Sequence, residues 1–154
     1  MVIIKDSKIH GKGVFASKQF KKDEVVLKWN TSVKLVKSKV NELSAEERRY
    51  VTSLDKETYI LLQAPEKYVN HSCLPYVGII DYCDVALRDI KEGEELTVDY
   101  SMFVSEDYVS KWDCKCGSKL CRHKITGKDY LLPELQMRYK NHFSPSINKK
   151  IGKL

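Results

Sequence analysis

The sequence predicts a β-rich α+β fold, because short strand-like runs recur along the chain and few segments have helical character. Val2–Lys5, Val25–Trp29 and Thr58–Leu62 are rich in β-branched and aromatic residues and are followed by polar or turn-forming residues. A chain of 154 residues is long enough for one domain with a hydrophobic core, but not for two. We therefore expect a single domain built mainly from short strands.

Further strands are expected between these runs. They are Val14–Ala16, Val33–Val36, Tyr76–Ile80, Val85–Leu87 and Leu96–Tyr100. The turn Asp81–Asp84 would join two of them as a hairpin. The pattern Ser44-Ala45-Glu46-Glu47 has capping-box spacing and predicts a helix from Ser44 to about Leu54.

A second helix is expected near the end of the sequence. Pro133 would occupy its first turn, and Leu135, Tyr139 and Phe143 recur every four residues on one face. The basic stretch Lys149–Leu154 is expected to be a frayed end.

Charge and cysteine usage limit the classes of function. The net charge of +6 leaves a nucleic-acid partner open, although a solubilising lysine-rich surface explains it equally simply. The chain has no apolar run of membrane-spanning length, and Met1–Asp6 lacks signal-peptide features, so we expect a soluble protein made inside a cell. Five cysteines, three of them within Cys114–Cys121, favour a metal site in a reducing compartment over disulfides.

Two polar stretches interrupt the apolar pattern and predict a site. Tyr68–Cys73 contains Asn-His-Ser-Cys, and Gly93–Tyr100 ends a strand-like Leu-Thr-Val in Asp-Tyr. Asn, His and Ser carry several donors and acceptors that need partners when they are buried. Together they indicate a polar site in the interior of the fold.

These stretches resemble the two signature motifs of SET-domain protein-lysine methyltransferases, N-H-S-C-x-P and G-E-E-L-T-x-D-Y. His10–Ala16 is similar to the glycine-containing first motif of that family, and the resemblance covers residues 1–123. It implies an S-adenosylmethionine-dependent protein-lysine N-methyltransferase with a threaded, pseudoknot-like strand. It also implies a SET domain over 1–112 with an insert at about 38–66, a post-SET zinc segment over 113–123 and a C-terminal helical tail over 124–154.

The resemblance assigns roles to particular residues. Tyr100 would orient the substrate amine and the methyl group, and Trp29 and Val98 would line the channel for the substrate lysine. The implied cofactor-binding residues are Lys12, Gly13, Tyr59, Lys67, Asn70, His71 and Tyr100. For Trp29 and Tyr59, a packing role in the core is the alternative.

Three positions depart from the family pattern. Lys67 stands where the family commonly has Arg, which keeps the charge but loses bidentate geometry. Tyr76 replaces an Asn after the first motif. Val98 replaces an aromatic residue that often limits the number of methyl groups, so we expect di- or trimethylation.

Cys114, Cys116 and Cys121 supply three thiolates for a zinc site, one fewer than a tetrahedral structural site needs. The resemblance implies that Cys73 is the fourth ligand, and His123 is the rival. Cys83 is left over and is expected to be a small core residue.

The leading hypothesis is therefore a methyltransferase that acts on an accessible lysine of a histone-like basic protein, either in the cytoplasm or on chromatin. One alternative is a catalytically inactive SET-like zinc module that binds chromatin or nucleic acid. A zinc-knuckle nucleic-acid binder would explain the charge and the cysteines, but not the other motifs. The sequence makes no prediction about oligomeric state.

Overall fold

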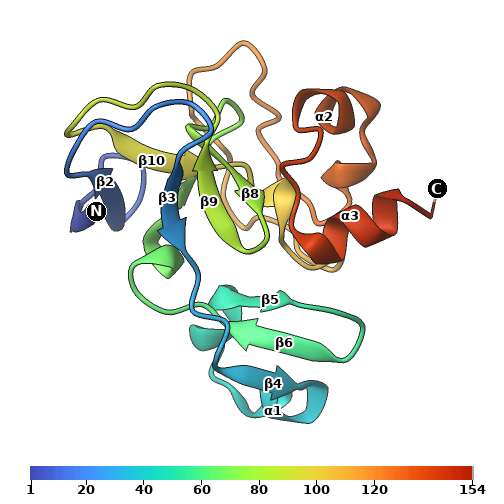
Figure 1. Cartoon of the computed structure of the whole chain (residues 1–154). Coiled ribbons are helices and arrows are strands. Elements are labelled where there is room, and N and C mark those ends of the chain that lie inside the picture. Colours follow the sequence, from blue (N-terminus) through green and yellow to red (C-terminus); the bar gives the residue numbers. More distant parts are fainter. Residues whose placement is uncertain (154) are drawn as a thin grey trace.

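A computed structural model describes residues 1–153 and consists mainly of strands (Figure 1). The larger sheet has the order β1-β2-β10-β8-β9-β3, and β7 also pairs with β10. Its strands are β1 (Val2–Asp6), β2 (Lys12–Ala16), β3 (Val25–Lys28), β7 (Asn70–His71), β8 (Val77–Ile80), β9 (Cys83–Ala86) and β10 (Glu95–Val98). The predicted β-rich fold class is thus confirmed.

A second, three-stranded sheet has the order β4-β6-β5 and lies below the larger sheet in Figure 1. Its strands are β4 (Lys34–Val36), β5 (Val51–Ser53) and β6 (Thr58–Leu61). The helices are α1 (Lys37–Glu42), α2 (Pro133–Arg138) and α3 (Pro145–Ile151). Short 3-10 turns cover Glu47–Tyr50, Glu66–Tyr68, Tyr100–Met102 and Asp129–Leu131. In residues 1–153, no helix is both long and apolar enough to cross a bilayer.

The strand β10 is threaded between β7 and β8. It pairs in parallel with both, so that Val98 faces His71 on one strand and Val77 on the other. The segment 72–76 connects those two strands, with the Ser72 amide donating to Val98 O (3.1 Å) and the Tyr76 amide to Thr97 O (3.0 Å). This crossing is the expected pseudoknot-like arrangement, an exception to the rule that chains avoid threading.

The helix predicted from Ser44 to about Leu54 is wrong. The capping box itself forms, because the Glu47 amide donates to Ser44 Oγ (3.2 Å) and the Ser44 amide donates to Glu47 Oε2 (2.9 Å). However, only one 3-10 turn follows, and Val51–Ser53 then pairs with β6 as strand β5. Cross-strand pairing of these partly β-branched residues outweighs the local capping signal.

The C-terminal segment is more ordered than the sequence predicted. Leu135, Tyr139 and Phe143 are all buried as expected, but α2 ends at Arg138 and Phe143 lies beyond it. The expectation of a frayed end from Lys149 is wrong for the part that belongs to α3, whose Ser144 N-cap accepts from the Ile147 amide. Leu154 lies outside the described residues.

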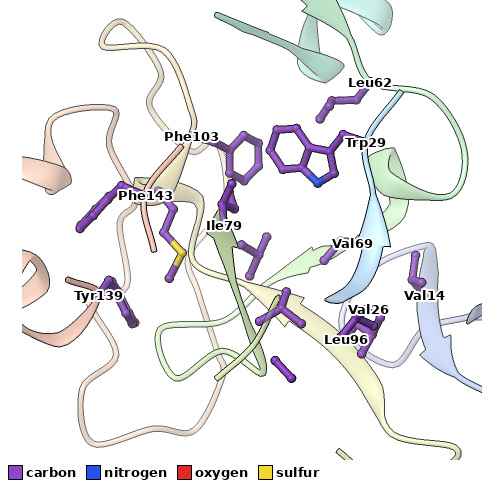
Figure 2. Packing of buried hydrophobic residues seen from close by; sticks show 14 of the residues in the cluster. Val14, Val26, Trp29, Leu62, Val69, Ile79, Leu96, Phe103, Tyr139 and Phe143 are labelled. Carbon is purple, nitrogen blue, oxygen red and sulfur yellow. The ribbon is translucent and has the colours of Figure 1, made fainter. Parts of the chain in front are cut away.

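One core joins the larger sheet, the insert and the C-terminal segment (Figure 2). Trp29 packs edge-on against Phe103 at 5.4 Å between ring centroids. The C-terminal segment runs along β8, where the Ile79 amide donates to His142 O (3.0 Å). A Cβ at Gly78 would lie 2.7 Å from the His142 Cβ, so only glycine allows this approach.

This core contains a buried carboxyl group, that of Asp84. Its Oδ1 accepts from Trp29 Nε1 (2.9 Å), whereas its Oδ2 has no hydrogen-bond partner among residues 1–153. Burial raises the pKa of Asp84 to about 7, and nearby Glu66 adds to the rise while the Trp29 hydrogen bond opposes it. Asp84 is therefore expected to be largely protonated in the folded protein below neutral pH.

Substitution of Asp84 by Asn should change the pH dependence of stability. The native pKa lies above the unfolded value of about 3.9, so the folded state binds more protons and the free energy of unfolding falls as pH rises from about 4 to 7. Denaturant titrations should show Asp84→Asn becoming more stable relative to the parent over this interval, by on the order of 1 kcal/mol or more.

Asp81→Asn, which removes a charge from the exposed turn of the same hairpin, is the control for net charge. Parallel stability curves for the parent and Asp84→Asn would contradict the assignment.

Candidate active site and metal centre

Asn70 connects the first glycine-containing turn to β10. Its Nδ2 lies within hydrogen-bonding distance of His10 O (3.2 Å), Lys12 O (3.0 Å) and Glu95 Oε1 (2.9 Å). A Cβ on Gly13 would lie 2.3 Å from that Glu95 oxygen, so glycine is needed for the carboxylate to reach its place. The turn and the two signature motifs therefore meet at Asn70.

A cavity of ≈ 820 Å³ opens beside this junction and contains Asn70, His71 and Tyr100. Its charged lining is balanced, with Lys8, Arg88 and Lys115 against Glu94, Glu95 and Asp113. Such a lining suits a ligand that carries charges of both signs. It therefore fits S-adenosylmethionine, which combines an amino-acid zwitterion with a cationic sulfonium.

His71 is neutral and its hydrogen-bond partners define its tautomer. Burial lowers its pKa to about 4, although Asp99 opposes this shift. The Tyr100 amide donates to His71 Nδ1 (3.2 Å), so the ring proton resides on Nε2, which lies 3.3 Å from Cys73 Sγ. His71 thus connects the backbone of Tyr100 to a cysteine.

Tyr100 is a neutral phenol under ordinary conditions. Burial raises its pKa, with smaller contributions from Tyr108 and Tyr50. Its hydroxyl donates to Val69 O (3.3 Å), and its ring packs edge-on against His71 at 5.2 Å. The hydroxyl and the ring of Tyr100 are therefore both held in place, and the residue lines the cavity.

Four cysteine sulfurs gather next to this site. The Sγ atoms of Cys73, Cys114, Cys116 and Cys121 all lie within 4.8 Å of one another. Zinc–thiolate bonds of about 2.3 Å in a tetrahedron would place these sulfurs about 4 Å apart. The donor set and its spacing fit a structural Zn²⁺.

The rival ligand His123 and the remaining cysteine, Cys83, lie outside the sulfur cluster. His123 is exposed, has a left-handed backbone (φ 59°) and does not belong to the sulfur cluster. Cys83 lies in β9 with its sulfur near Asp81 O (3.7 Å), and it is only half-buried rather than a core residue as expected.

A buried polar network fixes the end of β10 and the cysteine cluster together. Arg122 makes two hydrogen bonds to Asp99 (2.7 and 2.8 Å) and one to Asp129 (2.9 Å), and its amide approaches Cys73 Sγ (3.4 Å). The Tyr139 hydroxyl lies 3.2 Å from both Asp99 Oδ2 and Cys73 O. Arg122 and Tyr139 therefore both contact Cys73 of the first signature motif and Asp99 of the second.

Asp99 is charged despite complete burial. Burial alone would raise the pKa of its carboxyl, but the hydrogen bonds and charge of Arg122 hold it below the ordinary value. A buried ion pair is costly to break, since removal of one partner leaves an uncompensated charge. Arg122 is thus required to compensate the buried charge of Asp99.

Several predicted site residues do not meet in the Tyr100 cavity. Tyr59 lines a separate cavity with Lys37 over its ring (5.5 Å), and Lys67 lies over Tyr50 and Tyr68 (5.5 and 5.0 Å). Trp29 is a buried core residue that contacts Phe103.

Val98 and Lys12 lie beside the site without lining it. Val98 is buried in β10 between β7 and β8. Lys12 turns its side chain toward Asp6 (3.5 Å) and offers only its carbonyl to Asn70.

The structure adds residues that the sequence reasoning missed. Trp112 lines the cavity and lies 5.8 Å from the His71 ring and 6.3 Å from the Tyr100 ring. Its position just before the cysteine segment was the available signal. Arg122 directly follows the last cysteine, but nothing local in the sequence pairs it with Asp99.

The cysteine cluster makes a direct prediction about metal content. Purified protein should contain one zinc per chain by atomic emission, and Cys116→Ser should lose most of it. Loss of the metal should lower the melting temperature by roughly 5–10 °C, because its bonds order residues that have little core of their own. Cys83→Ser, which lies outside the cluster, is the control. Unchanged melting after chelation would argue against a structural zinc.

Comparison with known proteins identifies the family. The SET domain family model matches residues 11–101, more than half of the chain. Histone-lysine N-methyltransferase 2D of Homo sapiens is 32% identical over 136 residues, covering 79% of this chain. Histone-lysine N-methyltransferase trithorax of Drosophila virilis is 33% identical and covers 75%.

A third relative, the H3 lysine-4 specific histone-lysine N-methyltransferase of Chaetomium globosum, is 28% identical over 138 residues and covers 75% of the chain. These alignments span only 2%, 3% and 12% of the respective relatives, so the chain corresponds to a small part of each. The matched residues include both signature motifs and the threaded strand, and we conclude that this chain belongs to the SET domain family.

Proposed function

We propose that this SET domain is an S-adenosylmethionine-dependent protein-lysine N-methyltransferase. The observation that carries the proposal is the convergence of Asn70, His71 and Tyr100 on one charge-balanced cavity in a chain similar to histone-lysine N-methyltransferases. The proposed division is a SET domain over 1–112, a zinc segment over 113–123 and a tail over 124–154.

The reaction requires a neutral amine, because a lysine ammonium has no lone pair and its pKa in peptides is about 10.4. When bound, S-adenosylmethionine supplies the methyl group, which leaves sulfur and bonds to the amine nitrogen. The amine proton then passes to solvent. A buried amine next to a cationic sulfonium has a lowered pKa, which favours the neutral form.

Tyr100 is the proposed catalytic residue and acts by orientation. Its phenol remains protonated because burial raises its pKa, so it can accept or donate a hydrogen bond but does not serve as an anionic base. Positioning of this kind can contribute roughly 7–11 kcal/mol to a two-component reaction. Asn70, His71 and the segment Lys8–His10 before β2 form the proposed cofactor wall. Lys12 and Gly13, at the start of β2, would support this wall through the Lys12 carbonyl that Asn70 contacts. Tyr59 and Lys67 would have to move to reach it.

The proposed substrate is an accessible lysine of a basic protein such as a histone, on the basis of the relatives' names. Chromatin would then be the place of action. The alternative is a SET-like zinc module without catalysis, which would not need the phenol of Tyr100 so well fixed between Val69 and His71. The cysteine cluster is compatible with both.

The first test is transfer of labelled methyl groups from S-adenosylmethionine to histones and whole-cell extract. Tyr100→Phe should reduce transfer by on the order of 100-fold while cofactor binding, measured by calorimetry, persists. Tyr82→Phe is the matched control, because its hydroxyl donates to Leu54 O (3.1 Å) outside the cavity. Equal transfer by parent and Tyr100→Phe, or absence of both labelling and cofactor binding, would favour the inactive module.

The number of methyl groups transferred is a separate proposal. Val98 is small and lies in β10, two residues before Tyr100. The room left by a missing aromatic side chain should allow a lysine that already carries one methyl group to rotate and react again. Mass spectrometry of a good substrate should therefore show di- or trimethyl-lysine. Products that stop at monomethyl-lysine would contradict this.

A further inference from the structure

A second cavity lies between the three-stranded sheet and the C-terminal segment. It has a volume of ≈ 630 Å³ and is lined by residues of α1, β5, β6, the loop 105–107 and α3. In Figure 1, α3 lies above this sheet, on the side where a turn joins β5 to β6. We call this cavity the basic groove, because six basic side chains line it: Lys37, Arg48, Lys56, Lys149, Lys150 and Lys153.

The groove carries an uncompensated positive charge. Its acidic residues are Asp55, Glu106 and Asp107, so six basic side chains face three acidic ones. The difference equals half of the net charge of +6 for the whole chain. The Tyr100 cavity, by contrast, is lined by three lysine or arginine residues and three acidic residues. The excess charge is therefore concentrated in this groove.

The acidic groups are already engaged within the protein. Asp55 Oδ1 accepts from the backbone amides of Glu57 and Thr58 (2.9 and 2.8 Å). Glu106 pairs with Lys150 (3.0 Å), and Asp107 accepts from a serine hydroxyl (2.6 Å).

The basic groups, by contrast, are mostly free of ion pairs. Within residues 1–153, Lys150 forms an ion pair, whereas the other five basic residues of the groove form none. These five are also exposed to solvent. They are available to an external anion.

The two walls of the groove face each other closely enough for their charges to interact. Lys149 in α3 contributes to the lowered pKa of Asp55 in the insert, although the hydrogen bonds from the Glu57 and Thr58 amides contribute more. An anion in the groove would therefore be flanked by cations of the insert on one wall and of α3 on the other. This arrangement suits a ligand with repeated negative charges better than a single small ion.

From these observations, we propose that the basic groove binds the phosphate backbone of duplex DNA. Exposed large hydrophobic side chains anchor many protein–protein interfaces. Within residues 1–153, no such side chain lines the groove, which favours a nucleic acid over a protein partner. Single strands are usually held by exposed aromatic rings, and the one aromatic residue of the groove, Tyr59, is half-buried beneath Lys37. Lysines that contact phosphates give affinity without sequence preference.

The test is fluorescence anisotropy of the full chain with a labelled duplex between 50 and 200 mM salt. The parent should bind with a Kd that rises steeply with salt, and the double variant Lys149→Glu/Lys153→Glu should bind about tenfold more weakly at 50 mM salt. Loss of two phosphate contacts should also reduce the salt slope by about 2. Both side chains are exposed, whereas α3 packs through Ser146 and Ile147, so the fold should persist and melting curves verify it.

The control is Lys22→Glu/Lys91→Glu, two exposed lysines outside the groove whose substitution changes net charge equally. Retention of DNA binding in this control, with loss in the groove variant, would support the proposal. Equal loss in both variants would reduce the effect to net charge and overturn it. Absence of duplex binding, or tighter binding of polyglutamate of equal charge, would also overturn it. None of these readouts requires methyltransferase activity.

Discussion

Asp99 and Arg122 form a buried ion pair at which separate parts of the chain meet. Asp99 directly follows the threaded strand β10 and precedes Tyr100, while Arg122 follows the last residue of the cysteine cluster. Tyr139 adds a hydroxyl contact to the same carboxylate from just beyond α2. Because a buried charge without its partner is strongly destabilising, this pair constrains the strand, the cysteine segment and the C-terminal segment to one arrangement. The site around Tyr100 depends on all three.

His71 connects the cysteine cluster to the candidate active site. Its Nδ1 accepts from the Tyr100 amide, and its Nε2 faces the sulfur of Cys73. A neutral imidazole with a fixed tautomer can make both contacts at once, whereas a protonated ring would lose the acceptor at Nδ1. Burial lowers the pKa of His71, so the ring stays neutral and keeps its contact with the Tyr100 amide while it lies next to Cys73 Sγ.

The two cavities differ in charge, and this difference separates their suggested roles. The Tyr100 cavity combines both signs in a polar lining next to buried motif residues, as expected for a zwitterionic cofactor. The basic groove has an excess of exposed cations on elements of the insert and the C-terminal segment. The proposed DNA-binding groove and the proposed catalytic cavity thus lie on different faces of the domain, and the insert that forms one wall of the groove lies within the matched residues 11–101.

Local sequence determined most of the strands and the β8–β9 hairpin, because strand periodicity and turn residues are properties of short segments. It also singled out Asn70, His71, Tyr100 and the four cysteines, because their residue types mark them within short motifs. The capping box at Ser44 also formed, yet the expected helix did not, since pairing of β5 with β6 is a contact between distant residues. Only the tertiary structure decided that Tyr59 and Lys67 lie away from the Tyr100 cavity, that Arg122 neutralises Asp99, and that cations from the insert and α3 gather in one groove. Each of these depends on long-range packing, which brings together residues whose spacing in the chain carries no signal.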